Sequence, residues 1–170
     1  MSLASAITDV EQLKDWPAVA RLLAWNADAV ESVRFDRDEL TVWIKRDLIR
    51  EALSFLRDDT ETQFNYLSDI TGVDWYPNEP RFEVVYHLLS LANKANPLKQ
   101  RLRLKVKLDG IDPRIDSATT VFPNANFYER EVFDLLGVRF EGHPYLRRIM
   151  MPEDWEGHPL RKDYPVEGYR

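Results

Sequence analysis

The stretch RLRLKVKL, residues 101–108, decides the fold class of this chain. Its apolar side chains (Leu102, Leu104, Val106 and Leu108) alternate strictly with its cations (Arg101, Arg103, Lys105 and Lys107). Strict alternation predicts a β-strand with one buried and one solvated face. We interpret the four cations as a solvated sheet surface rather than as a dock for an acidic partner.

The run FEVVYHLL, residues 82–89, is the most apolar stretch of the chain. Such a run predicts a strand that is buried on both faces. We therefore expect it to lie in the middle of the sheet, antiparallel to residues 101–108.

Shorter runs towards the N-terminus predict the remaining strands. Residues 33–35 and 40–44 flank a polar stretch and alternate as a hairpin with one buried face does. Residues 64–67 and 71–75 indicate a strand and a turn, which two prolines close. The sheet should therefore have about four strands.

Helices are predicted between and after these strands. Residues 17–26 carry apolar side chains at helical spacing and begin with a proline, which suits a first helical turn. Asp47 is expected to cap a helix to about residue 57, because its carboxylate can accept free backbone N–H groups. A last helix should begin at Asn126, with Glu129 in capping-box position, and end at Gly137.

Together these elements predict an α+β domain. A largely antiparallel sheet of about four strands has helices packed on one face, and an extended irregular C-terminal arm follows. We place the core domain at residues 1–137 and the arm at residues 138–170.

The composition excludes several classes of protein. The 170 residues have a hydrophobic fraction of 44% and a charged fraction of 31%, as in one globular domain. The absence of cysteine excludes disulfides and cysteine-ligated zinc or iron–sulfur clusters in this chain. A net charge of −6 argues against a nucleic-acid partner. We find no run of membrane-spanning length and no secretion signal, so we expect the chain to stay in the cytoplasm.

The arm, residues 138–170, shows no sustained helical or strand period. Prolines and glycines interrupt it, and its basic and acidic residues balance, which disfavours phosphate binding. It is rich in aromatic residues and arginine, the types that dominate interface hot spots. We expect an extended arm that becomes ordered against a partner. An arm folded back over its own domain is the alternative.

Charged residues are dense where the last predicted helix meets the arm. On a helix, Arg130 and Asp134 are four residues apart and Glu131 and Asp134 three, so these charges can meet on adjoining faces. Charges beside an apolar stripe cost desolvation energy unless they are paired. The pattern therefore favours a structural ion network that bridges the helix, the arm and a neighbouring chain.

Catalysis is the competing interpretation of these residues. Carboxylates of the last helix could act as a general base, or could bind a metal together with His143 and His158. Neither histidine lies within one helical turn of a carboxylate on the same helix, as helical metal sites usually require. We therefore predict no catalytic, cofactor-binding or metal-binding residue in this chain.

Two segments of the chain resemble a known family. The stretch EREVFDLLGVRFEGHPYLRRIM, residues 129–150, satisfies every position of the signature of the thirty-kilodalton subunit of respiratory NADH dehydrogenase, the bacterial C subunit. The residues that match are Glu129, Arg130, Glu131, Asp134, Leu135, Leu136, His143, Arg147, Ile149 and Met150. The family's closing element PLRKDYP stands at residues 159–165, and the resemblance spans about residues 30–167. Such a long composite match is highly specific.

The resemblance implies a function. It implies a cofactor-free subunit in the peripheral arm of proton-translocating NADH:quinone oxidoreductase (complex I), beside the D and B subunits, which hold the quinone site and a cluster respectively. The complex passes electrons from NADH through FMN and iron–sulfur clusters to quinone. It implies a hetero-oligomer at the cytoplasmic face of the bacterial inner membrane, attached through the complex, in which the isolated chain is inactive.

We expect the partner interface to include the signature and arm residues Glu129, Arg130, Glu131, Asp134, His143, Arg147, Arg148, His158, Arg161, Lys162 and Asp163. Basic members of this set should meet acidic groups on the partner. Two alternatives stay open. One is the equivalent subunit of a related membrane-bound hydrogenase or ferredoxin-driven dehydrogenase, and the other is a free-standing metal-dependent enzyme that uses His143 and His158.

Overall fold

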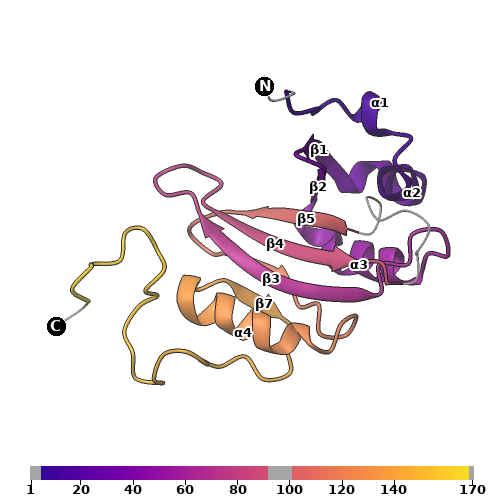
Figure 1. Cartoon of the computed structure of the whole chain (residues 1–170). Coiled ribbons are helices and arrows are strands. Elements are labelled where there is room, and N and C mark those ends of the chain that lie inside the picture. The colour runs from indigo at the N-terminus through magenta and orange to yellow at the C-terminus, as the bar shows by residue number, and fades with distance from the viewer. Residues whose placement is uncertain (1–4, 92–100, 169–170) are drawn as a thin grey trace.

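The computed structural model describes residues 5–91 and 101–168, and Figure 1 shows how they are arranged. The helices are α1 (Val10–Leu13), α2 (Pro17–Asn26), α3 (Ile49–Asp58) and α4 (Ala125–Leu136), with short 3-10 helices η1 (Ala27–Ala29) and η2 (Arg46–Leu48). The strands are β1 (Val30–Asp36), β2 (Glu39–Ile44), β3 (Tyr66–Asp74), β4 (Phe82–Leu89), β5 (Arg101–Leu108), β6 (Arg114–Asp116) and β7 (Arg139–Glu141). The predicted helix at residues 17–26 and the strands at residues 82–89 and 101–108 are confirmed.

Five strands form one sheet in the order β1-β2-β5-β4-β3, and β6 and β7 form a small parallel pair. Within the large sheet every neighbouring pair is antiparallel except β2 and β5. The α+β class is confirmed, with five strands in place of about four. The prediction that residues 82–89 form the middle strand is wrong, because β2 pairs with β5 and makes β5 the central strand.

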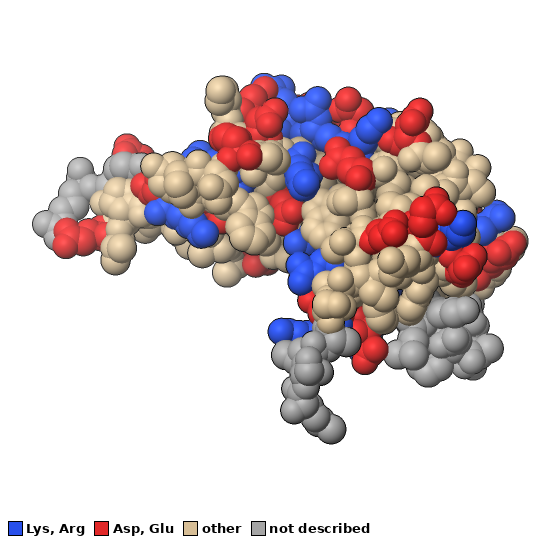
Figure 2. Space-filling model, turned by 90° about the horizontal axis from the view of Figure 1, so that it is seen from above, with Lys and Arg blue, Asp and Glu red and all other residues tan. Residues whose placement is uncertain are grey.

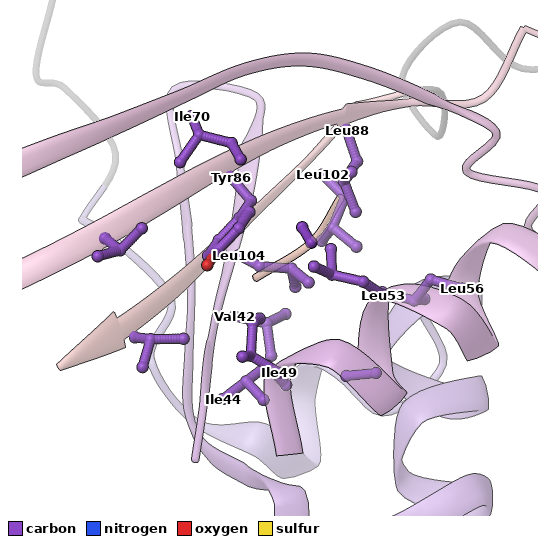
Figure 3. Close-up of a cluster of buried hydrophobic side chains, with 14 of the residues drawn as sticks. Val42, Ile44, Ile49, Leu53, Leu56, Ile70, Tyr86, Leu88, Leu102 and Leu104 are labelled. Carbon is purple, nitrogen blue, oxygen red and sulfur yellow. The ribbon is translucent and has the colours of Figure 1, made fainter. Parts of the chain in front are cut away.

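The apolar side chains that alternate with cations in residues 101–108 form one side of the core. Val42, Leu104, Tyr86 and Ile70 stand in register across β2, β5, β4 and β3. In Figure 3 the apolar side chains of α3 pack against this row. Removing these side chains from water contributes roughly 1.5–3 kcal/mol for each fully buried residue.

Helix α4 covers the same face of the sheet next to β3. The contact depends on Gly72 of β3, because a Cβ atom there would lie against Leu136 and 3.2 Å from a methyl group of Val132. The prediction that the helices pack on one face therefore holds for α3 and α4. The strand at residues 66–74 is continuous, with a bulge between Leu67 and Asp69, where the sequence indicated a strand and a turn.

The opposite face of the sheet is less solvated than expected. Lys105 donates to Glu83 at 2.9 Å, and Glu83 also accepts from the indole N–H of Trp43 at 2.8 Å. Arg103 pairs with Glu39. Only two of the four cations of β5, Arg101 and Lys107, are exposed, because β5 is central and its neighbours shield the others.

Two predicted helix caps are wrong. Asp47 lies inside η2, and α3 begins two residues later without a side-chain cap. Helix α4 begins at Ala125, and Glu129 turns away from the helix start into the core. The end of α4 is as predicted, because Gly137 adopts the left-handed conformation with φ of +79°.

Charges are mixed over the surface in Figure 2, where acidic and basic side chains alternate over the face shown. This mixing agrees with the ion pairs that span neighbouring elements, such as Arg50 with Asp116. Among the described residues, no helix has the length and apolar character needed to cross a membrane.

Candidate functional site

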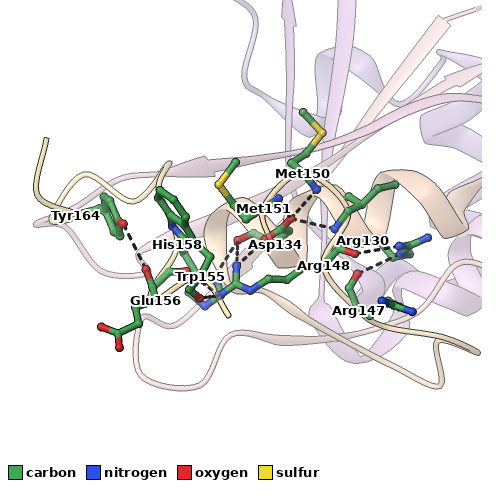
Figure 4. Close-up of polar contacts among 12 residues, drawn as sticks. Arg130, Asp134, Arg147, Arg148, Met150, Met151, Trp155, Glu156, His158 and Tyr164 are labelled. Carbon is green, nitrogen blue, oxygen red and sulfur yellow. Dashed lines mark hydrogen bonds and ion pairs between the residues drawn. The ribbon is translucent and has the colours of Figure 1, made fainter. Parts of the chain in front are cut away.

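A buried carboxylate of α4 binds four consecutive residues of the arm. Asp134 accepts the backbone N–H groups of Ile149, Met150 and Met151 at 3.0, 2.7 and 2.8 Å, and the guanidinium of Arg148 at 2.5 Å. Figure 4 shows Arg148, Met150 and Met151 of the arm converging on Asp134. Burial opposes ionisation of this carboxyl group, but the hydrogen bonds from Met151, Arg148 and their neighbours outweigh it and lower its pKa.

Two arginines hold the backbone of the arm. Arg148 donates to the carbonyl oxygens of Trp155 and Gly157 at 2.8 and 2.9 Å, in addition to its ion pair with Asp134. Arg130 of α4 donates to the carbonyl oxygens of Arg147 and Arg148. Arg130 and Asp134, which the sequence places four residues apart on the helix, therefore bind the arm rather than one another.

The two histidines fix further points of the arm. The Nδ1 atom of His143 accepts the N–H of Tyr145 at 3.0 Å, so its Nε2 donates to the carbonyl of Asn126. His158 donates from Nδ1 to the carbonyl of Asp134 at 2.8 Å. Burial is the main cause that lowers the pKa of both imidazoles. Within residues 5–91 and 101–168, no group of three or more histidines and carboxylates could hold a metal ion.

The C-terminal part of the arm caps α4. Leu160 donates its N–H to the carbonyl of Leu135 at 3.0 Å, and Arg161 donates to the carbonyl of Leu136 at 2.7 Å. The last carbonyl groups of a helix have no partner within the helix. The arm supplies those partners, so the helix end and the arm stabilise each other.

A second anchor lies where β3 and β4 meet. Arg81 donates to both oxygens of Asp74 at 2.9 Å and to both oxygens of Asp163 at 2.6 and 2.9 Å. The backbone N–H of Lys162 donates to Asp74 at 2.8 Å. Burial opposes ionisation of Asp74, but Arg81 and the two backbone donors lower its pKa to about 2.

The side chains of three residues that were expected at the partner interface, Glu129, Glu131 and Arg147, do not take part in the contacts between α4 and the arm. Glu129 is fully buried on the other side of α4, where it accepts from Ser117 and from the N–H of Ala118, both at 2.6 Å. Burial raises its pKa to about 7. Glu131 is exposed, and Arg147 pairs with Glu153 at the surface of the arm.

Sequence reasoning missed Arg81 and Asp74. An arginine directly before the most apolar strand was the only local signal, and it does not identify Asp163 as a partner. Arg148 and Asp163, for which contacts with another chain were expected, form ion pairs within this chain. The arm is thus tied to its own domain through backbone and charged groups.

Beyond β7, whose Phe140 is buried, many apolar side chains of the arm point outwards. Its large exposed apolar residues are Tyr145, Ile149, Met150, Trp155, Leu160 and Val166. Met150 is 58% exposed and Leu160 60% exposed although their backbone N–H groups bind α4. An exposed apolar surface that is held in place by polar anchors is typical of a protein interface.

The sequence of residues 42–170, which includes α4, both anchors and the arm, matches the family model described as respiratory-chain NADH dehydrogenase, 30 Kd subunit. The chain belongs to this family. Its relatives include the NADH-quinone oxidoreductase C subunit of Roseiflexus sp. (strain RS-1), which is 49% identical over 86% of this chain and 81% of the relative. The corresponding protein of Citrifermentans bemidjiense, which has the same name, is 46% identical over 89% of each chain.

A solved structure supports the fold. The trypsin-resistant fragment (1-134) of Nqo5 is 32% identical, with a TM-score of 0.60, and the match covers 76% of this chain and 99% of the fragment. The chain is therefore a subunit of the NADH-quinone oxidoreductase type, in agreement with the resemblance noted from its sequence.

Gly137→Ala should loosen the arm. A Cβ atom at Gly137 would lie 2.6 Å from the His158 ring and against the Arg161 guanidinium, while Gly142 has φ of +77° and nothing within 4 Å. Left-handed backbone disfavours any Cβ, so both alanine variants should lose about 1–2 kcal/mol in the free energy of unfolding. Only Gly137→Ala should also speed trypsin cleavage after Arg161. Equal cleavage rates in the two variants would show that the steric contact is unimportant.

Proposed function

We propose that this chain is the cofactor-free thirty-kilodalton subunit of a proton-translocating NADH:quinone oxidoreductase. In this role it braces the quinone-site subunit and the cluster-bearing subunit beside it, and other chains carry FMN and the iron–sulfur clusters. The absence of cysteine supports this division of roles, because iron–sulfur clusters are held by cysteine thiolates. The chain would lie at the cytoplasmic face of the membrane and be attached through the complex.

The proposal rests on one observation, which is that the arm binds its own domain through polar groups and exposes apolar side chains. Its charged and backbone groups bind α4 and the β3–β4 end of the sheet, which leaves apolar side chains directed outwards. Because the arm is already positioned, a partner that covers it loses little conformational entropy. We call the exposed apolar side chains of the arm, from Tyr145 to Val166, the apolar strip. A preorganised surface of this kind suits a scaffold that holds neighbouring subunits in fixed positions.

The sequence relatives favour NADH as the electron donor. The relatives compared above are named as subunits of NADH-quinone oxidoreductase, rather than of a hydrogenase or of a ferredoxin-driven dehydrogenase. The alternative of a metal-dependent enzyme has no specific support, because His143 and His158 both bind backbone groups of their own chain.

The double variant Met150→Ser, Leu160→Ser should weaken binding to the quinone-site subunit at least about tenfold, because hot-spot apolar side chains contribute more than 1 kcal/mol each. Both side chains point outwards, so the anchors of the arm stay intact. The measurement is the affinity of the purified chain for the purified quinone-site subunit by biolayer interferometry.

Tyr66→Ser is the control, since this residue is exposed at the start of β3 and lies outside the apolar strip. Deletion of residues 143–170 is a harsher test, because it also leaves the buried Asp134 without its partners. Unchanged affinity in both the double variant and the deletion would refute the proposed role of the arm.

A further inference from the structure

Two loops meet at the end of the sheet where β3 and β5 finish. Glu79 of the β3–β4 loop accepts the N–H of Gly110, which follows β5, at 3.0 Å and the N–H of Arg81 at 2.9 Å. These loops together expose three large apolar side chains, Trp75, Tyr76 and Ile111, which we call the tip patch. None of the three belongs to the arm or to the family signature at residues 129–150.

The exposure of the tip patch has no structural cause within this chain. Ile111 is 99% exposed, so its side chain contributes nothing to the core, while Tyr76 and Trp75 are 47% and 43% exposed. Clustered exposed apolar residues mark interaction sites more often than isolated ones do. The patch therefore calls for an explanation outside the chain.

Tyr76 of the tip patch is held in place. The guanidinium of Arg81 stacks on the Tyr76 ring at 5.0 Å and is itself fixed by Asp74 and Asp163. The N–H of Tyr76 donates to Asp74 at 2.9 Å. An aromatic side chain that is held in this way can be buried by a partner at a low cost in conformational entropy.

The tip patch is continuous with the arm. Asp163 binds Arg81, and the ammonium group of Lys162 lies 6.0 Å from the centre of the Trp75 ring. Figure 1 shows the β3–β4 loop and the arm at the same end of the molecule. A protein that covers the arm near Leu160 would therefore also reach the tip patch.

We propose that the tip patch is a second contact site for the protein partner that binds the arm, and that the partner presents an apolar hollow there with basic residues beside Ile111. This inference rests on the proposed function. The charges support it, because Glu79 and Asp109 border the Ile111 side of the patch, where Asp112 is paired with Arg114, and Lys162 borders the Trp75 side. The same carboxylates would repel the anionic headgroups of a membrane, the other class of surface that takes exposed tryptophan and tyrosine.

The test measures the affinity of the full chain for the purified quinone-site subunit with Ile111→Ser and with the double variant Tyr76→Ser, Ile111→Ser. Tyr66→Ser is the matched control, because Tyr66 lies at the opposite end of β3 and is 44% exposed. We expect Ile111→Ser to weaken binding about threefold or more and the double variant at least tenfold, with Tyr66→Ser within twofold of the wild type. If the double variant does not fold, the affinity of Ile111→Ser alone tests the inference.

Three results would overturn the inference. Normal affinity of Ile111→Ser, together with lost affinity after deletion of residues 143–170, would refute the tip patch and leave the proposed function standing. Absence of binding by the wild-type chain would refute both. Sedimentation of the wild type, but not of the double variant, with phosphatidylglycerol vesicles would assign the patch to a membrane surface instead.

Discussion

Asp134→Asn should release the arm from α4 and lower the free energy of docking by about 3 kcal/mol, as expected when one partner of a buried ion pair is removed. The carboxylate of Asp134 meets three backbone N–H groups and the Arg148 guanidinium, all of which are donors. An asparagine has only one acceptor oxygen, and its amide N–H groups would face a donor. Either the Arg148 guanidinium loses the carboxylate that balances its charge, or the three backbone N–H groups lose their shared acceptor.

Limited proteolysis and hydrogen exchange measure this effect. A loss of about 3 kcal/mol corresponds to an increase of about 100-fold in the open population, so trypsin should cleave the arm after Arg161 about 100-fold faster. Exchange of the Met150 and Met151 amides should accelerate to the same degree, since both donate to Asp134.

Glu131→Gln provides the matched control for Asp134→Asn. It removes the same charge from the same helix, but Glu131 is exposed, so its stability should change by no more than about 0.5 kcal/mol. If the arm of Asp134→Asn stays as protected as that of Glu131→Gln, the anchor lies elsewhere.

Glu129→Gln should stabilise the chain at pH 8 by up to about 3 kcal/mol, since each pKa unit corresponds to 1.36 kcal/mol. Burial raises the pKa of Glu129 to about 7 from its ordinary value of 4.5. The folded wild type therefore holds a proton that the unfolded chain releases. This contribution to stability is fully present below pH 4.5 and is lost as the pH rises through about 7.

Glutamine can keep the contacts of Glu129. Its oxygen can accept the N–H of Ala118, and its amide N–H can donate to the Ser117 hydroxyl, which also contacts Thr119. The nearby Tyr86 hydroxyl is fully buried, and burial followed by the charge of Glu129 raises its pKa. A neutral residue at position 129 removes that unfavourable charge.

The measurement is the free energy of unfolding in urea between pH 5 and pH 8 for both proteins. Other groups titrate in this range, because burial lowers the pKa of His87, His143 and His158. Their contribution has the opposite sign, and stability is lost as the pH falls below 6.5. The histidine contributions are the same in both proteins, so they cancel when the two free energies of unfolding are subtracted. The stability difference between variant and wild type should grow from pH 5 to pH 7 and then level off. A difference that is independent of pH would mean that Glu129 is ionised throughout.

The sequence by itself determined the elements of the core and the family. Alternation in residues 101–108 identified a strand with one buried face, and Gly137 marked the end of α4 because only a residue that tolerates positive φ fits there. Such features depend on neighbours within a few residues, so local periodicity reports them. The family signature was readable for the same reason, because its residues lie close together in the chain.

Only the tertiary structure decided which strand is central, where Glu129 points and what holds the arm. The hydrogen bond from Lys162 to Asp74 joins residues 88 positions apart, and Arg81 and Asp163 are separated by 82. A periodic pattern shows which side chains face the core but carries no information about which distant group will lie beside them. Those pairings follow from the packing of α4 on β3 and from the return of β2 to β5, and packing is a property of the whole chain.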